Sequence, residues 1–176
     1  MKKNNKVLLL FLLPVFLFSC SKTVIPPKWD YELKAVNLYL KTDPKLHLYS
    51  GIPHTLVLCI YFLTDPNEFN QQIDDKGGLE KLCECSKFHP SVTNAKRFIL
   101  HPDKEYTESL DRPAGAQYVG IVAGYYKLQK ENVVRLYKIP VIEDKSMRTI
   151  TQKPGVLNLN LFLGPQQIEE LRGKEK

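Results

Sequence analysis

The stretch from Val156 to Leu163 reads VLNLNLFL, and its alternation decides the fold class. Leu157, Leu159, Leu161 and Leu163 recur at every second position, with two asparagines between them. A period of two places such a set on one face of a β-strand. Burying each leucine would contribute about 1.5–3 kcal/mol before the entropy cost is counted. The stretch therefore predicts a strand whose leucine face lies in a hydrophobic core.

The preceding chain repeats this extended pattern in several short segments. Trp29–Leu40 has a period of two with a slip between Ala35 and Val36, which predicts a strand with a bulge. Thr55–Leu63 is a nearly unbroken apolar run, which is typical of a strand buried on both faces. Further strands are expected over Val92–Leu100, Tyr106–Leu110, Ala116–Tyr126 and Val133–Val141.

Two glycines and one proline add detail to these strands. Gly120 and Gly124 lie inside an apolar segment, which predicts that a bulky group packs closely against one face of that strand. Pro140 has no N–H to donate, so it is expected to end a ladder of hydrogen bonds or to lie at a sheet edge.

One short helical insertion interrupts the strands. Asp65-Pro66-Asn67-Glu68 has the proline and acidic residue of a helix start, Phe69 and Ile73 share one helical face, and Gly77-Gly78 ends the pattern. Because no helix alternates regularly with the strands, a parallel α/β sheet is not expected. The sequence predicts an all-β fold, an antiparallel β-sandwich of seven to eight strands with a small helical insertion between strands two and three.

The amino terminus has the layout of an export signal. Lys2, Lys3 and Lys6 precede the apolar run from Val7 to Phe18, which is shorter than the roughly 20 residues of a spanning helix. Leu17-Phe18-Ser19-Cys20 resembles the bacterial lipoprotein box. That resemblance implies a diacylglyceryl group on the thiol of Cys20, cleavage before it and acylation of the new amine.

Such a lipid would fix the protein to a membrane, because three acyl chains bind firmly where one binds only marginally. The next residue is Ser21 rather than the aspartate that resembles an inner-membrane retention signal, which favours the periplasmic face of the outer membrane. The alternative is an ordinary signal peptide with a chance cysteine at position 20.

The chain of 176 residues is therefore divided into four parts. Residues 1–19 are the predicted signal peptide, 20–28 a lipidated tether, 29–164 the sandwich domain, and 165–176 a polar carboxyl-terminal tail. The net charge falls from +6 to +3 when the three lysines of the signal are removed. That mild excess, without a groove-reading motif, does not indicate a nucleic-acid partner.

Three cysteines remain in the mature chain. Because the periplasm is oxidising, it would allow one disulfide, joining Cys59 to Cys83 or Cys85, and one thiol would be left over. Cys59 could instead be a small core residue in its apolar run.

The sequence predicts neither a metal site nor an enzyme. Cys83-Glu84-Cys85 lacks the second ligand pair of a zinc site, and no acidic residue accompanies His47 and His54 at ligand spacing. A nucleophile made of Cys83 or Cys85 with His89 has no third orienting group.

The segment from Thr42 to His54 is unusual for a loop, because it carries bulky residues at its centre. These residues could fold back onto the core, or they could form an exposed contact surface. In the second interpretation Leu46, Leu48 and Tyr49 are the apolar anchors, and Lys45 and His47 form a polar rim.

From Trp29 to about Leu163 the chain resembles the outer-membrane lipoprotein of the type VI secretion system, the TssJ (SciN) family. The resemblance depends on the lipoprotein box and on the order of the segments Val57-x-x-Ile60-Tyr61-x-Leu63, Phe69, Lys96-Arg97-Phe98-Ile99-Leu100 with Pro102, and Ala116-x-Tyr118-Val119-Gly120-Ile121-Val122-Ala123-x-Tyr125. The family's short Asp-Leu-Asn-like stretch after the first strand is replaced here by Lys45–Tyr49.

The resemblance implies a transthyretin-like sandwich under the outer membrane that binds the periplasmic carboxyl-terminal region of the inner-membrane protein TssM. With TssL, these proteins would form the envelope-spanning secretion complex. The loop between the first two strands, here Thr42 to His54, would be the partner contact. The alternative function is a periplasmic lipoprotein whose sandwich binds a small ligand.

Overall fold

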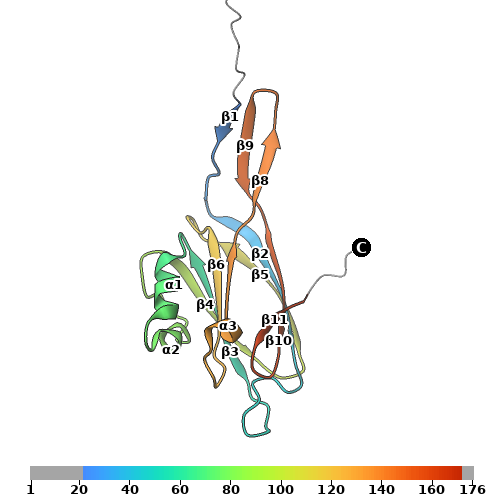
Figure 1. Cartoon of the computed structure of the whole chain (residues 1–176). Coiled ribbons are helices and arrows are strands. Elements are labelled where there is room, and N and C mark those ends of the chain that lie inside the picture. Colours follow the sequence, from blue (N-terminus) through green and yellow to red (C-terminus); the bar gives the residue numbers. More distant parts are fainter. Residues whose placement is uncertain (1–21, 172–176) are drawn as a thin grey trace, which may run out of the picture.

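The computed structural model describes residues 22–171. It is a two-layered β-sandwich with a three-stranded extension at one end and two helices on one face (Figure 1). The all-β class and the helical insertion between the second and third predicted strands are confirmed. The elements are β1 Thr23–Ile25, β2 Glu32–Thr42, β3 Leu56–Leu63, α1 Asn67–Asp74, α2 Gly78–Leu82, β4 Val92–Leu100, β5 Glu105–Arg112, β6 Tyr118–Ala123, α3 Lys130–Val133, β7 Val134–Lys138, β8 Val141–Lys145, β9 Thr149–Pro154, β10 Leu157–Leu163 and β11 Ile168–Glu170.

The first layer has the strand order β11-β10-β2-β5. β10 runs parallel to β2, with Leu157 opposite Val36 and Leu163 opposite Thr42, while β2 and β5 are antiparallel. The prediction of a purely antiparallel sandwich is therefore wrong for this pair. Parallel pairing requires a long connection, and here almost the whole domain lies between the two strands.

The predicted slip in the first long strand is present as a register shift in β2. The pairing of β2 with β5 moves between Glu32 and Val36, and Lys34 has a positive φ of 51° within this interval. Ala35 and Val36 are consecutive and both buried. The bulge allows two successive apolar side chains to enter the interior.

The second layer has the strand order β4-β3-β6-β7, and its strand β3 is buried on both faces as predicted. Leu58, Ile60 and Phe62 pack into the main core between the two sheets. Cys59 and Tyr61 point the other way, into a smaller apolar cluster beneath α1 and α2. The helical insertion therefore covers the outer face of this sheet.

The third sheet, β1-β9-β8, projects from the sandwich (Figure 1). β8 and β9 form a hairpin, and β1 pairs in parallel with β9. The hairpin was not predicted from the sequence. The predicted tether of residues 20–28 is also corrected, because β1 within it is part of this sheet. The strand expected over 133–141 is divided into α3, β7 and the start of β8. Pro140 separates β7 from β8, where the chain leaves the sandwich.

The start of the predicted polar tail belongs to the fold. β11 pairs antiparallel with β10, and Ile168 is 1% exposed in the main core. The domain therefore extends beyond residue 164. Within residues 22–171, no helix is both long and apolar enough to cross a membrane.

Candidate functional site

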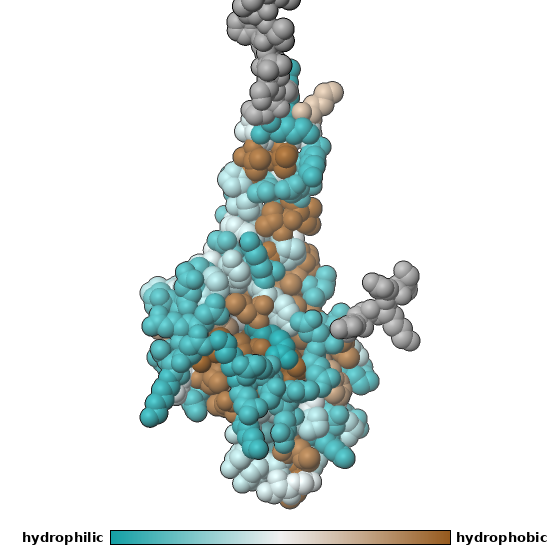
Figure 2. All heavy atoms as spheres, in the orientation of Figure 1, coloured by the Kyte–Doolittle hydropathy of each residue, from teal (hydrophilic) through white to brown (hydrophobic). Residues whose placement is uncertain are grey.

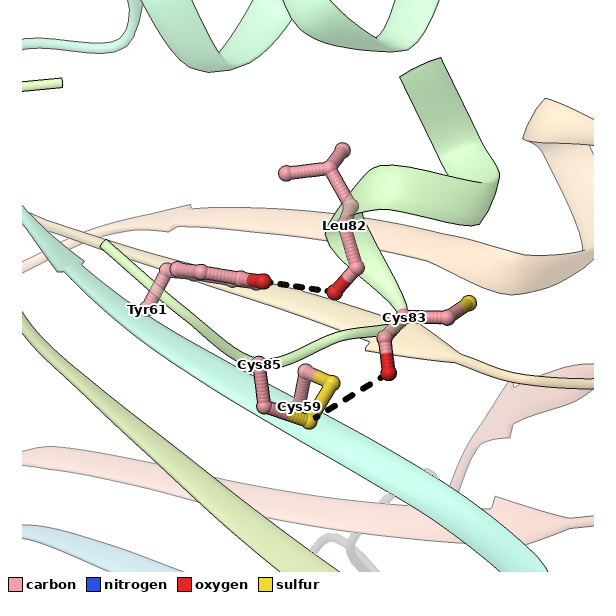
Figure 3. The surroundings of a disulfide bond; sticks show 5 residues. All are labelled: Cys59, Tyr61, Leu82, Cys83 and Cys85. Carbon is pink, nitrogen blue, oxygen red and sulfur yellow. Dashed lines mark hydrogen bonds between the residues drawn. A yellow bond between two sulfur atoms is a disulfide. The ribbon is translucent and has the colours of Figure 1, made fainter. Parts of the chain in front are cut away.

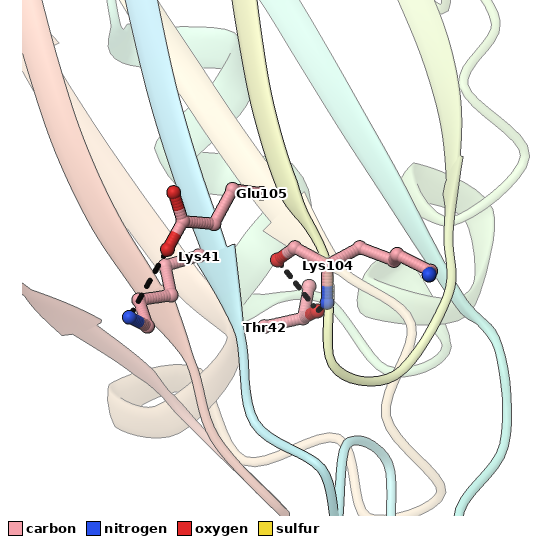
Figure 4. A network of polar contacts seen from close by, with 4 residues as sticks. All are labelled: Lys41, Thr42, Lys104 and Glu105. Carbon is pink, nitrogen blue, oxygen red and sulfur yellow. Dashed lines mark hydrogen bonds and ion pairs between the residues drawn. The ribbon is translucent and has the colours of Figure 1, made fainter.

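The loop between β2 and β3 is fixed at its base by Thr42, the last residue of β2. Thr42 is 2% exposed, and its hydroxyl oxygen accepts a hydrogen bond from the N–H of Lys104 at 2.8 Å (Figure 4). The same hydroxyl lies 2.8 Å from the carbonyl oxygen of His101, and the Thr42 N–H donates to the carbonyl oxygen of Lys104. Lys41 forms an ion pair with Glu105 beside it. The loop therefore leaves β2 from a firmly hydrogen-bonded position.

Leu46 folds back into the sandwich. Its exposure is 0%, and it is part of the main core with Leu40, Leu56 and Tyr125. The prediction that Leu46 is an exposed partner-binding anchor is therefore wrong, because the side chain holds the loop from inside. A deletion of Lys45–Tyr49 would consequently remove the side chain of Leu46 from the core and destabilise the fold.

The backbone of the loop is tightly turned. His47, Ser50 and Gly51 have φ values of 47°, 51° and 79°, a left-handed conformation that costs energy for the two residues other than glycine. Tyr49 and Ile52 exchange two backbone hydrogen bonds of 3.0 and 2.9 Å, and the His54 N–H donates to the carbonyl oxygen of Leu46. The loop thus presents a single defined shape, which lowers the entropy cost of binding a partner.

His47 has a structural position rather than that of a free rim residue. Its Nδ1 lies 2.8 Å from the carbonyl oxygen of Thr55, and its ring packs edge-on against Tyr125 at 5.9 Å. His54 lies 6.0 Å away, measured between ring centroids. Within residues 22–171, no group of three or more His, Cys, Asp or Glu side chains is placed to hold a metal ion.

Tyr125 connects the loop to the turn between β10 and β11. It is 3% exposed, and its hydroxyl donates to the carbonyl oxygen of Gln167 at 2.9 Å. Burial raises the pKa of this hydroxyl above its ordinary value, so it remains a donor at neutral pH. The Leu48 N–H donates to the carbonyl oxygen of Pro165 in the same turn.

Apolar and aromatic side chains emerge from this frame at one end of the molecule. Tyr49 is 44% exposed, Ile52 61% and Tyr126 64%, and Leu48 is half-buried. The rings of Tyr49 and Tyr126 stack with their centroids 4.1 Å apart. We call these four residues, with Pro165, the contact surface. Lys45 and Lys127 are exposed beside it.

Tyr126 and Pro165 were missed in the sequence because they come from two other turns, and Ile52 was missed although it lies in the predicted loop. The pair Tyr125-Tyr126 could have indicated an exposed tyrosine, because two successive side chains in extended backbone point to opposite sides. The contact surface borders a hollow of about 150 Å³ between the loop and Tyr126. That volume is below the roughly 300 Å³ of ordinary small-molecule pockets, so the hollow does not favour the ligand-binding alternative.

The three cysteines of the described chain lie at the apolar cluster under the helices. Cys59 of β3 is disulfide-bonded to Cys85, and Cys83 has a free thiol (Figure 3). Burial raises the pKa of the Cys83 thiol to about 11, so the reactive thiolate is scarce. The Tyr61 hydroxyl donates to the carbonyl oxygen of Leu82 at 2.5 Å in the same cluster. The bridge fastens the helical insertion to the sheet.

The predicted lipidation residue Cys20 and the predicted signal peptide lie outside the described residues. The described fold and site define a β-sandwich with a tightly turned, apolar-tipped loop at one end.

Comparisons with known proteins give the family. Residues 34–153 match the T6SS-SciN family model, described as type VI secretion lipoprotein, VasD, EvfM, TssJ. Since the match covers more than half of the sequence, the chain belongs to this family of type VI secretion lipoproteins. No curated protein matches the chain.

Solved structures share the fold at low sequence identity. The type VI lipoprotein TssJ1 from Pseudomonas aeruginosa has a TM-score of 0.58 and 21% identity, covering 86% of this chain and 100% of the other. Serratia marcescens Lip, a membrane-bound component of the system, has a TM-score of 0.56 and 15% identity over 78% and 96% of the chains. A chain from a structure of the TssM carboxyl-terminal domain (869–1107) from EAEC has a TM-score of 0.57 and 15% identity over 78% and 98%.

Proposed function

We propose that this protein is attached to the periplasmic face of the outer membrane by an N-acyl diacylglyceryl lipid on Cys20. We further propose that it binds the periplasmic carboxyl-terminal region of the inner-membrane protein TssM through the contact surface. TssM in turn would connect it to TssL in the type VI secretion membrane complex. The protein would act as a scaffold in this complex and not as an enzyme.

The observation that carries the proposal is the rigid placement of exposed aromatic and aliphatic side chains at one end of the molecule. Tyr49 and Tyr126 support each other by stacking, and Ile52 extends the apolar area beside them. Tyrosine and tryptophan are enriched among the residues that dominate the energy of protein interfaces, and aromatic pairs bind at low entropic cost. Lys45 and Lys127 provide a basic rim for acidic groups of a partner.

The direction in which the contact surface faces also supports the proposal. The loop between β2 and β3 lies at one end of the molecule, and β1, where the described chain begins, lies at the other (Figure 1). A lipid on Cys20 would therefore leave the contact surface pointing away from the outer membrane. That orientation suits a partner that arrives from the inner membrane.

The test is titration of the mature chain with the purified TssM carboxyl-terminal domain, monitored by calorimetry. The double variant Tyr49→Ala with Ile52→Ala should weaken binding by about 10-fold to 1,000-fold, because two contact residues are removed. A matched control is Ile99→Ala, which removes a side chain of similar exposure on β4, at 58%. Unchanged affinity of the double variant, or equal loss in the control, would contradict the proposed surface.

A further inference from the structure

Among residues 22–171, no second layer covers the projecting sheet β1-β9-β8. Val24, Ile25 and Ile142 are 52%, 44% and 60% exposed, and Figure 2 shows apolar surface along this extension above the main body. Val24 shares a face with Ile150, and Ile25 shares the other with Thr151, so apolar groups occupy both faces. A surface of this kind normally faces another apolar phase or partner.

The tip of the hairpin is a fixed turn that carries one fully projecting side chain. The Ser146 N–H donates to the carbonyl oxygen of Thr149 at 2.8 Å, and the Ser146 hydroxyl lies 2.5 Å from that of Thr149. Between them Met147 is 90% exposed, the highest value among the large apolar residues of the described chain. The turn therefore holds a flexible apolar side chain at the end of the molecule.

Basic residues surround this tip. Lys22, Lys145 and Arg148 are all exposed beside Met147, and Arg148 has no acidic partner in the described part of the chain. Lys145 forms an ion pair of 3.2 Å with Glu143. Asp144 and Glu143 lie on β8 and Lys153 on β9, further from the turn. An exposed apolar group ringed by cations is the arrangement that binds the interface of an anionic membrane.

The covalent chain places this tip close to the proposed lipid. The Thr23 N–H donates to the carbonyl oxygen of Arg148 at 3.0 Å, so β1 begins at the hairpin turn. Three residues of chain span at most about 10 Å, and Thr23 follows Cys20 by three residues. A lipid on Cys20 would therefore bring the headgroups of the bilayer within reach of Met147 and Arg148.

We propose that the hairpin tip is a second membrane contact, which rests on the proposed lipid attachment at Cys20. Met147 enters the headgroup layer of an anionic phospholipid leaflet, and Arg148 and Lys22 bind its phosphates. The five-residue strand β8 is about 17 Å long, so the hairpin holds the sandwich away from the bilayer. The lipid alone would let the domain tumble, whereas two contacts fix its direction.

The experiment uses the full lipidated protein in vesicles of phosphatidylethanolamine and phosphatidylglycerol that contain brominated lipids. Met147→Trp reports the tip, and Ile52→Trp, a site 61% exposed at the opposite end, is the matched control. Trp29 contributes background fluorescence, which is measured on the parent protein and subtracted. We expect quenching and a blue shift of the emission for Met147→Trp and neither for Ile52→Trp. Equal quenching at both sites, or none at the tip, would overturn the proposal.

Charge reversal tests the phosphate contacts. Adding Arg148→Glu to Met147→Trp should reduce the quenching, since each basic residue near an anionic surface favours contact by roughly fivefold. Vesicles of phosphatidylcholine, which carries no net charge, should reduce the quenching in the same way. If neither Arg148→Glu nor the change of lipid alters the quenching, Arg148 is not part of the contact.

Two measurements separate this proposal from the proposed function. The intact mass of the protein shows whether Cys20 is acylated. If Cys20 is unmodified, the proposed membrane contact is overturned, because it rests on that lipid. Titration with the TssM domain reports the contact surface, which Met147→Trp leaves untouched. Absence of TssM binding with normal quenching would therefore reject only the proposed TssM contact and leave the membrane contact standing.

Discussion

The rings of Tyr49 and Tyr126 are stacked with their centroids 4.1 Å apart, although the two residues belong to different loops. Tyr126→Ala would leave Tyr49 unsupported and remove exposed aromatic area. We expect a loss of TssM-domain affinity of about 1–2 kcal/mol, or roughly 5-fold to 30-fold, measured by calorimetry. Tyr126→Phe keeps the ring and is the control. A similar loss in both variants would show that the hydroxyl, not the stacking, matters.

A close approach between Gly120 and Phe69 predicts a stability effect. A Cβ added at Gly120 would lie 2.6 Å from Cζ of the Phe69 ring, so Gly120→Ala should destabilise the domain by about 1–3 kcal/mol in urea unfolding. At Gly124 the nearest atom would be 3.6 Å away, an ordinary contact, and Gly124→Ala is the matched control. Combining Gly120→Ala with Phe69→Leu should restore part of the loss. Equal unfolding midpoints for the two alanine variants would contradict the packing.

Reduction of the Cys59–Cys85 bridge should loosen the helical insertion. The bridge closes 26 residues, and removing such a link typically costs about 2–4 kcal/mol. Cys59→Ser with Cys85→Ser should therefore lower the urea midpoint, measured by circular dichroism. Cys83→Ser should leave the bridge and the midpoint unchanged, because the Cys83 thiol is half-buried and holds its proton. Mass spectrometry after alkylation would detect any exchange between Cys83 and Cys85.

Alkaline pH should destabilise the protein. Burial raises the pKa of Tyr61, Tyr125 and Tyr137 above the ordinary value, and that of Cys83 to about 11. The native chain keeps these protons at a pH where the unfolded chain releases them. Stability is therefore complete below the unfolded pKa values and falls as pH rises above about 9.

The urea midpoint measured at about pH 8 and about pH 10.5 checks this direction. Tyr125→Phe removes one buried titrating group and should flatten the decline, with a slope smaller by at most about 1.4 kcal/mol per pH unit. A midpoint that rises with pH would contradict the assignment of these groups as buried.

The carboxyl-terminal strand should matter for folding despite its polar neighbours. Ile168 is 1% exposed in the main core, so Ile168→Ala should cost about 2–4 kcal/mol. Glu169→Ala changes the adjacent exposed residue on β11 and should be nearly neutral. Thermal melts of the two variants would show the difference. Equal melting temperatures would place β11 outside the cooperative fold.

The elements that the sequence predicted well are those with strong local periodicity. Leu159 and Leu161 are buried on one face of β10, β3 is buried on both faces, and Gly120 meets Phe69 as a close approach requires. Each of these features follows from spacing within one segment, so no knowledge of distant contacts is needed.

The features that were missed depend on contacts between distant segments. Nothing within β10 indicates that Leu157 pairs in parallel with Val36. β8 and β9 are mainly polar, and no core face marks them as strands. In the loop without a period, Leu46 and Tyr49 look alike, yet one is buried and the other is 44% exposed.

The parallel pairing of β2 with β10 has a consequence for how the protein reaches its native state during synthesis. Asn37 and Asn158, which hydrogen-bond across these strands, are 121 residues apart. A chain that emerges amino terminus first leaves one edge of β2 unpaired until β10 has also emerged, which is near the end of the chain. Closure of such a long loop is slow, and an open strand edge attracts other chains. Chaperones that shield β2 during this interval would therefore raise the yield of folded protein.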